Sequence, residues 1–283
     1  MTDVATTTRT APALPARETI RSTPLIAFGA LLLRDLSVLR KEFGQFMART
    51  VMQPLLFVFV FAYVFPKIGQ GVGGAAGSAA FSSILVPGVV AIACIFQGIQ
   101  AVALPLVQDF GYSREIEDRV MAPLPVWGVA LEKVVAGAIQ GLIAAAIVFP
   151  LALVVPATPV HLNVRPFLLL TLLPLAAFTA ASLGLVLGTR VQPRQVPLLF
   201  GIVVIPIVFL GATYYPWANL SPIAWLKALV LLNPLVYMSE GMRVSLTPWV
   251  PHMAYWAIYG GLLIFIAVFM ALGIDGFRRR VLS

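Results

Sequence analysis

Side chains able to make or break bonds are few in this sequence and lie far apart. Cys94 stands alone inside an apolar stretch, and the two histidines, His161 and His252, are remote from each other along the chain. A zinc or iron site takes about four Cys, His or carboxylate ligands at short spacings, and a catalytic centre needs converging acids, bases or nucleophiles. The sequence therefore predicts neither, and a single cysteine excludes a disulfide within the chain.

Nucleotide chemistry also lacks its usual motif. A phosphate loop reads G-x-x-x-x-G-K-[ST], so its lysine follows a glycine. None of the four lysines does so; they are Lys41, Lys67, Lys133 and Lys227. We therefore expect no ATP bound by this route and no cofactor in this chain, and any ATP-driven activity would need another subunit.

Glu240 and Arg243 are three residues apart in an apolar part of the chain. On a helix, this spacing places both side chains on one face, where they can form an ion pair. An ionisable pair near a membrane must find a partner or water. Two roles stay open for the pair: it pins the local structure, or it contacts a transported molecule.

The elements that must position these residues are six long runs with few or no charges. They cover about residues 50–66, 81–108, 134–157, 166–189, 195–216 and 253–274. About 20 apolar residues cross a hydrocarbon core of about 30 Å as a helix. With 60% hydrophobic and 11% charged residues, the composition is far from that of soluble domains. It predicts an all-α integral membrane protein with six transmembrane helices.

The charges between these runs predict the orientation. An even number of spans puts both termini on one side, and 15 of the 19 lysines and arginines fall there. The positive-inside rule then places both termini in the cytoplasm of a cell whose plasma (inner) membrane the chain crosses. A net charge of +8 fits this orientation and anionic headgroups better than nucleic acid, so no nucleic-acid partner is expected.

The N-terminal part divides into two segments before the membrane domain, residues 46–283. Residues 1–23 are rich in Thr, Ala, Pro and Arg and are predicted to be a disordered cytoplasmic tail. Residues 24–45 repeat apolar side chains every three or four positions, which predicts an amphipathic helix along the cytoplasmic interface. This helix is either a lipid anchor or a surface that also receives a cytoplasmic partner.

The most charged cytoplasmic segment covers about residues 109–125, between the second and third predicted spans. A short amphipathic helix over about 113–121 would turn its charges away from the membrane. The segment is either an ordinary charged loop or a docking helix through which a cytoplasmic ATPase acts on the spans. The candidate coupling residues are Tyr112, Arg114, Glu115, Glu117 and Arg119.

An external segment of about residues 214–245 separates the fifth and sixth predicted spans. Its 12-residue apolar run, 228–239, rises only about 18 Å as a helix, which is too little to cross. We therefore predict an outer re-entrant helical hairpin, whose backbone polar groups are covered by protein. Four aromatic residues are either an interfacial belt or the lining of a substrate exit: Tyr214, Tyr215, Trp217 and Trp225.

Three stretches carry a resemblance to a known family. Residues 233–243 read NPLVYMSEGMR, and Pro234, Leu235, Tyr237 and Arg243 fill the C-terminal signature of type-2 ABC-transporter permeases at the required spacing. Residues 209–216, FLGATYYP, resemble the motif that ends the fifth span in this family. The segment around Glu115 and Arg119 is similar to the family's coupling segment.

This resemblance implies the permease subunit of an ATP-driven exporter of lipids, drugs or glycans. ATP and Mg²⁺ would be bound by a separate nucleotide-binding subunit on the cytoplasmic face. A second permease copy, or a related permease, would complete the pathway among the membrane lipids. The alternatives from the residues alone are an ion-coupled secondary transporter and a membrane-embedded lipid-modifying enzyme. Both are disfavoured because the predicted span cores lack ionisable residues and a converging catalytic set.

Overall fold

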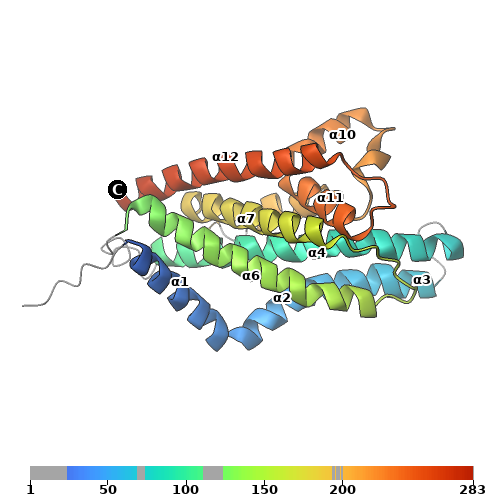
Figure 1. The fold of residues 1–283 in the computed structure, drawn as a ribbon, viewed down its shortest axis with the longest axis horizontal. Coiled ribbons are helices and arrows are strands. Elements are labelled where there is room, and N and C mark those ends of the chain that lie inside the picture. Colours follow the sequence, from blue (N-terminus) through green and yellow to red (C-terminus); the bar gives the residue numbers. More distant parts are fainter. Residues whose placement is uncertain are drawn as a thin grey trace, which may run out of the picture.

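The computed structural model describes residues 24–68, 74–110, 124–192, 195, 198 and 200–282 (Figure 1). Every regular element in these ranges is a helix, which confirms the all-α prediction. The predicted tail, 1–23, lies outside the described residues.

The helices follow one another without any intervening sheet in the described ranges. In chain order they are α1 (Pro24–Lys41), α2 (Phe43–Val58), the π-helical η1 (Phe59–Val64), α3 (Phe65–Lys67), α4 (Gly74–Gln108), α6 (Val126–Val154), α7 (Pro166–Arg190), the π-helical η4 (Phe200–Val204), α9 (Ile205–Phe209), the 3₁₀ helix η5 (Trp217–Leu220), α10 (Ala224–Leu229), the 3₁₀ helix η6 (Val230–Leu232), α11 (Pro234–Leu246) and α12 (Tyr255–Leu282).

Five helices of the described part are long and apolar enough to cross a membrane. They coincide with five of the six predicted runs and cover Phe43–Lys67, Ala80–Gln108, Val126–Val154, Pro166–Arg190 and Tyr255–Val281. The clearest difference is the start of α6, which lies at Val126 rather than at residue 134. The helix therefore continues through Glu132 and Lys133, which an uncharged-run criterion assigns to the preceding loop.

The predicted fifth span, residues 195–216, is not among these five helices. Its described helical part is η4 followed by α9, five residues each, which together rise about 15 Å. The chain leaves the helix after Phe209. Since residues 193, 194, 196, 197 and 199 are outside the description, the six-span layout stays a prediction at this point.

Helix α4 lies at the centre of the bundle and packs against α2, α6, α7 and α11. Small residues let α4 and α7 approach closely. A Cβ atom added at Gly98 would lie 2.5 Å from the Cβ of Ala180, and one added at Gly184 would lie 2.9 Å from the carbonyl oxygen of Ile99. Small residues at helix contacts are the usual means of close packing in a bilayer, where no hydrophobic effect drives helices together.

The predicted interfacial helix is present as α1, which ends at Lys41 and is separated from α2 by Glu42. It makes an oblique arm on the bundle and contacts α6 (Figure 1). Ala27 is its one buried residue, whereas Leu25 is 84% exposed. An apolar residue this exposed is consistent with the predicted contact with lipid, although the position of α1 relative to a membrane stays a prediction.

The region of the predicted external hairpin holds α10 and α11, toward the end of the bundle opposite the start of α1 (Figure 1). α11 has 13 residues, about 20 Å of helix, and is too short to cross a bilayer. It packs against α4, α7 and α12, and all of its residues except Tyr237 are buried. Protein thus covers its backbone, as a re-entrant helix requires; its depth in the membrane stays a prediction.

Candidate functional site

The Glu240–Arg243 pair lies on α11, and both side chains are 0% exposed. The Arg243 guanidinium donates to Glu240 Oε1 over 2.5 Å and to the carbonyl oxygen of Ala212 over 2.9 Å. The carboxylate of Glu240 also accepts backbone N–H bonds from Trp217 (2.9 Å) and Met253 (2.7 Å). One ion pair therefore connects α11 to the turn after α9, to η5 and to the segment before α12.

The network also contacts Ala212, a residue with an unusual backbone conformation. This residue has a φ of 52°, in the left-handed region that favours glycine. The hydrogen bond from Arg243 to its carbonyl oxygen is one of the contacts that hold this strained turn. Burial lowers the pKa of the Arg243 guanidinium, and the adjacent Glu240 carboxylate acts in the opposite direction. The guanidinium remains charged at neutral pH, because an arginine pKa lies far above it.

The start of α11 explains why the chain turns here. Asn233 caps the helix by accepting the backbone N–H of Leu235 on its side-chain oxygen over 2.9 Å, and Pro234 occupies the first turn, where a missing N–H costs nothing. The side-chain amide of Asn233 also donates to the carbonyl oxygen of Ile207 over 2.7 Å. Asn233 therefore ties the beginning of α11 to α9.

The family-signature residues occupy defined packing sites on α11. Leu235 is fully buried, and a Cβ atom added at Gly211 would lie 2.5 Å from its side chain. Tyr237 lies against α12, where a Cβ atom added at Gly261 would lie 2.2 Å from the tyrosine ring. The structure thus places Leu235 and Arg243 against the turn at Gly211 and Ala212, Pro234 at the start of α11, and Tyr237 against the neighbouring helix.

The four aromatic residues of the predicted hairpin are in different environments. Tyr214 packs against Phe57 and Phe61 of the first span, with ring centroids 5.8 and 5.7 Å away. Trp217 donates its indole N–H to the carbonyl oxygen of Lys227 over 3.1 Å, and the Lys227 ammonium lies 4.4 Å from the centre of the Trp217 ring system.

The other two aromatic residues differ again. Trp225 on α10 is 69% exposed, while Tyr215 is half-buried and its carbonyl oxygen lies 3.4 Å from the Arg243 guanidinium. Four such settings do not form a single aromatic lining in this conformation. An exposed Trp225 fits the interfacial-belt interpretation better than a closed substrate site.

The predicted coupling residues cannot be placed. Tyr112, Arg114, Glu115, Glu117 and Arg119 all lie outside the described residues. The two edges of the segment are described: Asp109 is buried after the last turn of α4, and Pro125 precedes α6. The segment therefore connects α4 to α6, two helices that pack against each other.

The sequence did not predict an ion pair that the structure shows between α1 and α6. The ammonium of Lys133 is 3% exposed and contacts the carboxylate of Asp35, and the neighbouring Glu132 is fully buried. Pro125 was the signal that could have revealed them. A helix that begins directly after this proline includes residues 132 and 133 in its second turn. Counting uncharged residues alone excluded them.

A polar chain between three candidate spans was also missed. The hydroxyl of Thr50 on α2 donates to the side-chain oxygen of Gln97 over 3.1 Å, and the amide of Gln97 donates to Gln140 on α6 over 3.3 Å. Uncharged polar side chains do not interrupt an uncharged run, so the search for spans passed over them. Such bonds join helices within a bilayer, each contributing about 1 kcal/mol.

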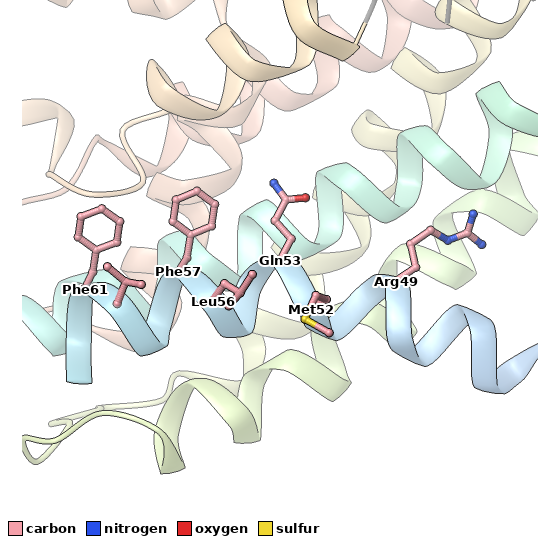
Figure 2. Close-up of a pocket in the computed structure, with 7 residues that line it drawn as sticks. Arg49, Met52, Gln53, Leu56, Phe57 and Phe61 are labelled. Carbon is pink, nitrogen blue, oxygen red and sulfur yellow. The ribbon is translucent and has the colours of Figure 1, made fainter. Parts of the chain in front are cut away.

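An open groove of about 430 Å³ runs along α2 and η1 (Figure 2). Its lining repeats every three or four residues along one helix: Arg49, Met52, Gln53, Leu56, Phe57, Val60 and Phe61. In contrast, no group of three or more His, Cys, Asp or Glu side chains suited to a metal occurs in the part of the chain that the structure describes.

Comparison with known families identifies the family to which this chain belongs. The family model for ABC-2 type transporters matches residues 26–247, from the start of α1 to the end of α11. The chain belongs to the ABC-2 type transporter family. It resembles the inner membrane transport permease YadH of Escherichia coli (strain K12), at 28% identity over 239 residues, 82% of this chain and 90% of the relative. The protein of the same name from Shigella flexneri matches equally well.

Family membership confirms the permease resemblance read from residues 233–243. A member of this family is the membrane subunit of an ABC transporter. Its ATP is hydrolysed by a partner subunit, in agreement with the lack of a phosphate loop in this sequence.

Proposed function

We propose that this ABC-2 permease is the membrane-spanning subunit of an exporter that moves a hydrophobic or amphipathic molecule outward from the cytoplasm or inner leaflet. The candidates are a lipid, a drug or a glycan. The family match over residues 26–247 carries the proposal. Short connections between the helices support export over import, because they leave no room for a large substrate-capturing domain outside.

We also propose that the chain lies in the inner membrane, as the name of its E. coli relative indicates, with six spans and both termini in the cytoplasm. The charges support this orientation. α1 ends with Arg40 and Lys41, and α12 carries Arg279 and Arg280 in its last turn. The start of α1 and the end of α12 lie at the same end of the bundle (Figure 1), as an even number of crossings requires.

Coupling to the ATPase is assigned to two elements at this end. The segment 109–125 would dock the nucleotide-binding subunit through Tyr112, Arg114, Glu115, Glu117 and Arg119, and its edges join α4 and α6. α1 would transmit motion to α6 through the Asp35–Lys133 ion pair. Closure of two ATPase subunits would thereby switch the bundle between two arrangements, each with its own affinity for substrate.

For the outer end, we assign Glu240 and Arg243 to holding the hairpin rather than to touching substrate. Their exposure is zero, and their bonds reach three other segments. Tyr214, Tyr215, Trp217 and Trp225 would form the outer interfacial aromatic belt. A second permease copy, identical or related, would complete the pathway.

Gentle purification of the tagged chain from its native membrane, followed by mass spectrometry, tests this function. The expected result is a stoichiometric partner with a G-x-x-x-x-G-K-[ST] loop and ATPase activity that amphipathic compounds stimulate. A homo-oligomer without any ATPase, under conditions that keep other ABC transporters intact, would refute the proposal and favour a carrier or an enzyme.

A further inference from the structure

Arg49 places a positive charge inside the first candidate span. It lies six residues inside α2, about 9 Å along the helix. Within the described part of the chain, Arg49 makes no ion pair and no hydrogen bond, whereas Lys133 at the same end of the bundle pairs with Asp35. A cation that far inside a candidate span is costly unless an anion or water reaches it.

Polar side chains surround the position of Arg49. A narrow crevice behind it is lined by residues of α2 and α4, among them Gln53 and Gln100. Both glutamines are half-buried and make no side-chain hydrogen bond within the described residues. Arg49 also borders a polar cavity of about 330 Å³ that opens between α1, α4 and α6. The carboxylates of Asp35 and Glu42 also line this cavity, whereas no acidic side chain of the described residues lines the crevice with Gln53 and Gln100. Donors for an anion are therefore concentrated at that crevice.

Apolar side chains continue from this point along the same helix face. Met52 (58% exposed), Leu56 (53%) and Val60 (37%) form the floor of the open groove, beside Phe57 and Phe61. Figure 2 shows Arg49 at one end of the groove and Phe61 at the other. From Arg49 to Val60 the helix rises about 16 Å, about half of a hydrocarbon core of about 30 Å.

We propose that this groove binds a single-chain anionic amphiphile, with its carboxylate on Arg49 and the Gln53 and Gln100 amides and its chain along Met52, Leu56 and Val60. Charge complementarity selects this occupant. A guanidinium binds a carboxylate with two parallel hydrogen bonds, and the apolar floor has the length of one leaflet. The groove volume lies within the range of small-molecule sites, roughly 300–1,000 Å³.

This inference rests on the proposed function, because the site would supply substrate from the leaflet on the side of α1. It narrows the substrate class from any amphipathic molecule to an anionic one with one chain. A neutral lipid would leave Arg49 without a counter-ion, and a purely apolar drug would leave both glutamine amides unsatisfied.

Photolabelling tests the site in the full chain, reconstituted in phosphatidylcholine nanodiscs. The probe is a fatty acid with a diazirine near the end of its chain, and the comparison compound is the corresponding alcohol. We expect the acid to label the 49–61 peptide roughly tenfold more than the alcohol, and Arg49→Gln to abolish that preference. Arg49→Lys should keep most of it.

The matched control is Arg40→Gln, which removes an exposed cation from the same arm but outside the groove. Equal labelling in wild type and Arg49→Gln, or an equal loss in Arg40→Gln, overturns the site. If Arg49→Gln does not fold, Leu56→Trp at an exposed position fills the groove and must reduce labelling. If the groove is instead covered by a second copy, the acid will not label it and a Met52→Cys variant will form disulfide-linked dimers.

The labelling needs neither ATP nor transport. Selective labelling without a co-purifying ATPase would keep this site and refute the proposed exporter. A co-purifying ATPase with no selective labelling would keep the exporter and remove the site.

Discussion

Glu240 and Arg243, three residues apart on α11, form an ion pair from which solvent is fully excluded. Glu240 also accepts backbone N–H bonds from Trp217 and Met253, and Arg243 also donates to the carbonyl oxygen of Ala212. Segments before and after α11 therefore depend on the same two side chains. The pair joins these segments at the end of the bundle that holds α10 and α11, and its removal should loosen all of them at once.

Glu240→Ala should destabilise the protein strongly, because it leaves a buried guanidinium without its carboxylate. Removal of one partner of a buried pair costs about 3–5 kcal/mol. Thermal unfolding in detergent measures this loss, and Trp225→Ala, at an exposed position of the same region, should change stability by less than about 0.5 kcal/mol. The double variant with Arg243→Ala should lose less than the sum of the single variants. Additive losses would show that the pair does not act as a unit.

Gly261→Ala should weaken the contact between α12 and α11, because the new Cβ would lie 2.2 Å from the Tyr237 ring. Gly260 is the matched control in the same helix, since an added Cβ there has no neighbour within 4 Å. Overpacking of this kind costs about 1–3 kcal/mol. We expect a lower melting temperature for Gly261→Ala and an unchanged or slightly higher one for Gly260→Ala. Equal melting temperatures would contradict the close contact.

Hydropathy was sufficient to predict the five long apolar helices that the structure describes, because a helix in a bilayer needs about 20 apolar residues whatever its neighbours are. The same criterion failed at the start of α6. Lys133 and Glu132 lie inside the helix and the packed bundle, where Lys133 is tolerated because Asp35 reaches it from α1. That partner is 98 positions away in sequence, and composition cannot reveal such a pairing.

For the Glu240–Arg243 pair on α11, a local sequence pattern was sufficient to predict the contact but not its surroundings. The i, i+3 spacing of Glu240 and Arg243 predicted their pairing, and the structure contains it. The backbone partners of Glu240, Trp217 and Met253, belong to other segments and follow from the tertiary fold alone. These contacts with other segments are encoded by no local pattern, and they support our proposal that the pair pins the local structure.

Asp35→Ala should reduce both stability and coupling, because it removes the carboxylate that contacts the buried Lys133 ammonium. A charge exchange, Asp35→Lys with Lys133→Asp, should recover part of the loss if attraction between α1 and α6 is what matters. Arg40→Ala on the same helix is the control and should behave like wild type. Substrate-stimulated ATPase activity of the purified complex is the measurement, and wild-type activity in Asp35→Ala would exclude this route of transmission.

Glu115→Ala and Arg119→Ala should lower substrate-stimulated ATPase activity while the permease stays folded. Both residues lie between the buried Asp109 at the end of α4 and Pro125 at the start of α6. Loss of the proposed docking contacts would change association with the ATPase rather than the core of the bundle. Unchanged melting temperature together with reduced co-purification of the ATPase is the expected pattern. Wild-type coupling in both variants would remove the docking assignment.

The orientation of the chain can be measured with thiols, since Cys94 is fully buried and is the native cysteine of the sequence. Trp225→Cys on α10 and Arg40→Cys on α1 place new thiols at exposed positions. α10 and the start of α1 lie toward opposite ends of the bundle (Figure 1). A membrane-impermeant maleimide should label Trp225→Cys in intact spheroplasts and Arg40→Cys only after lysis. The positive-inside rule predicts this result, because the cations cluster beside α1 and the end of α12. The reverse pattern would invert the topology and place the candidate coupling segment outside, where no ATP-hydrolysing partner could drive it.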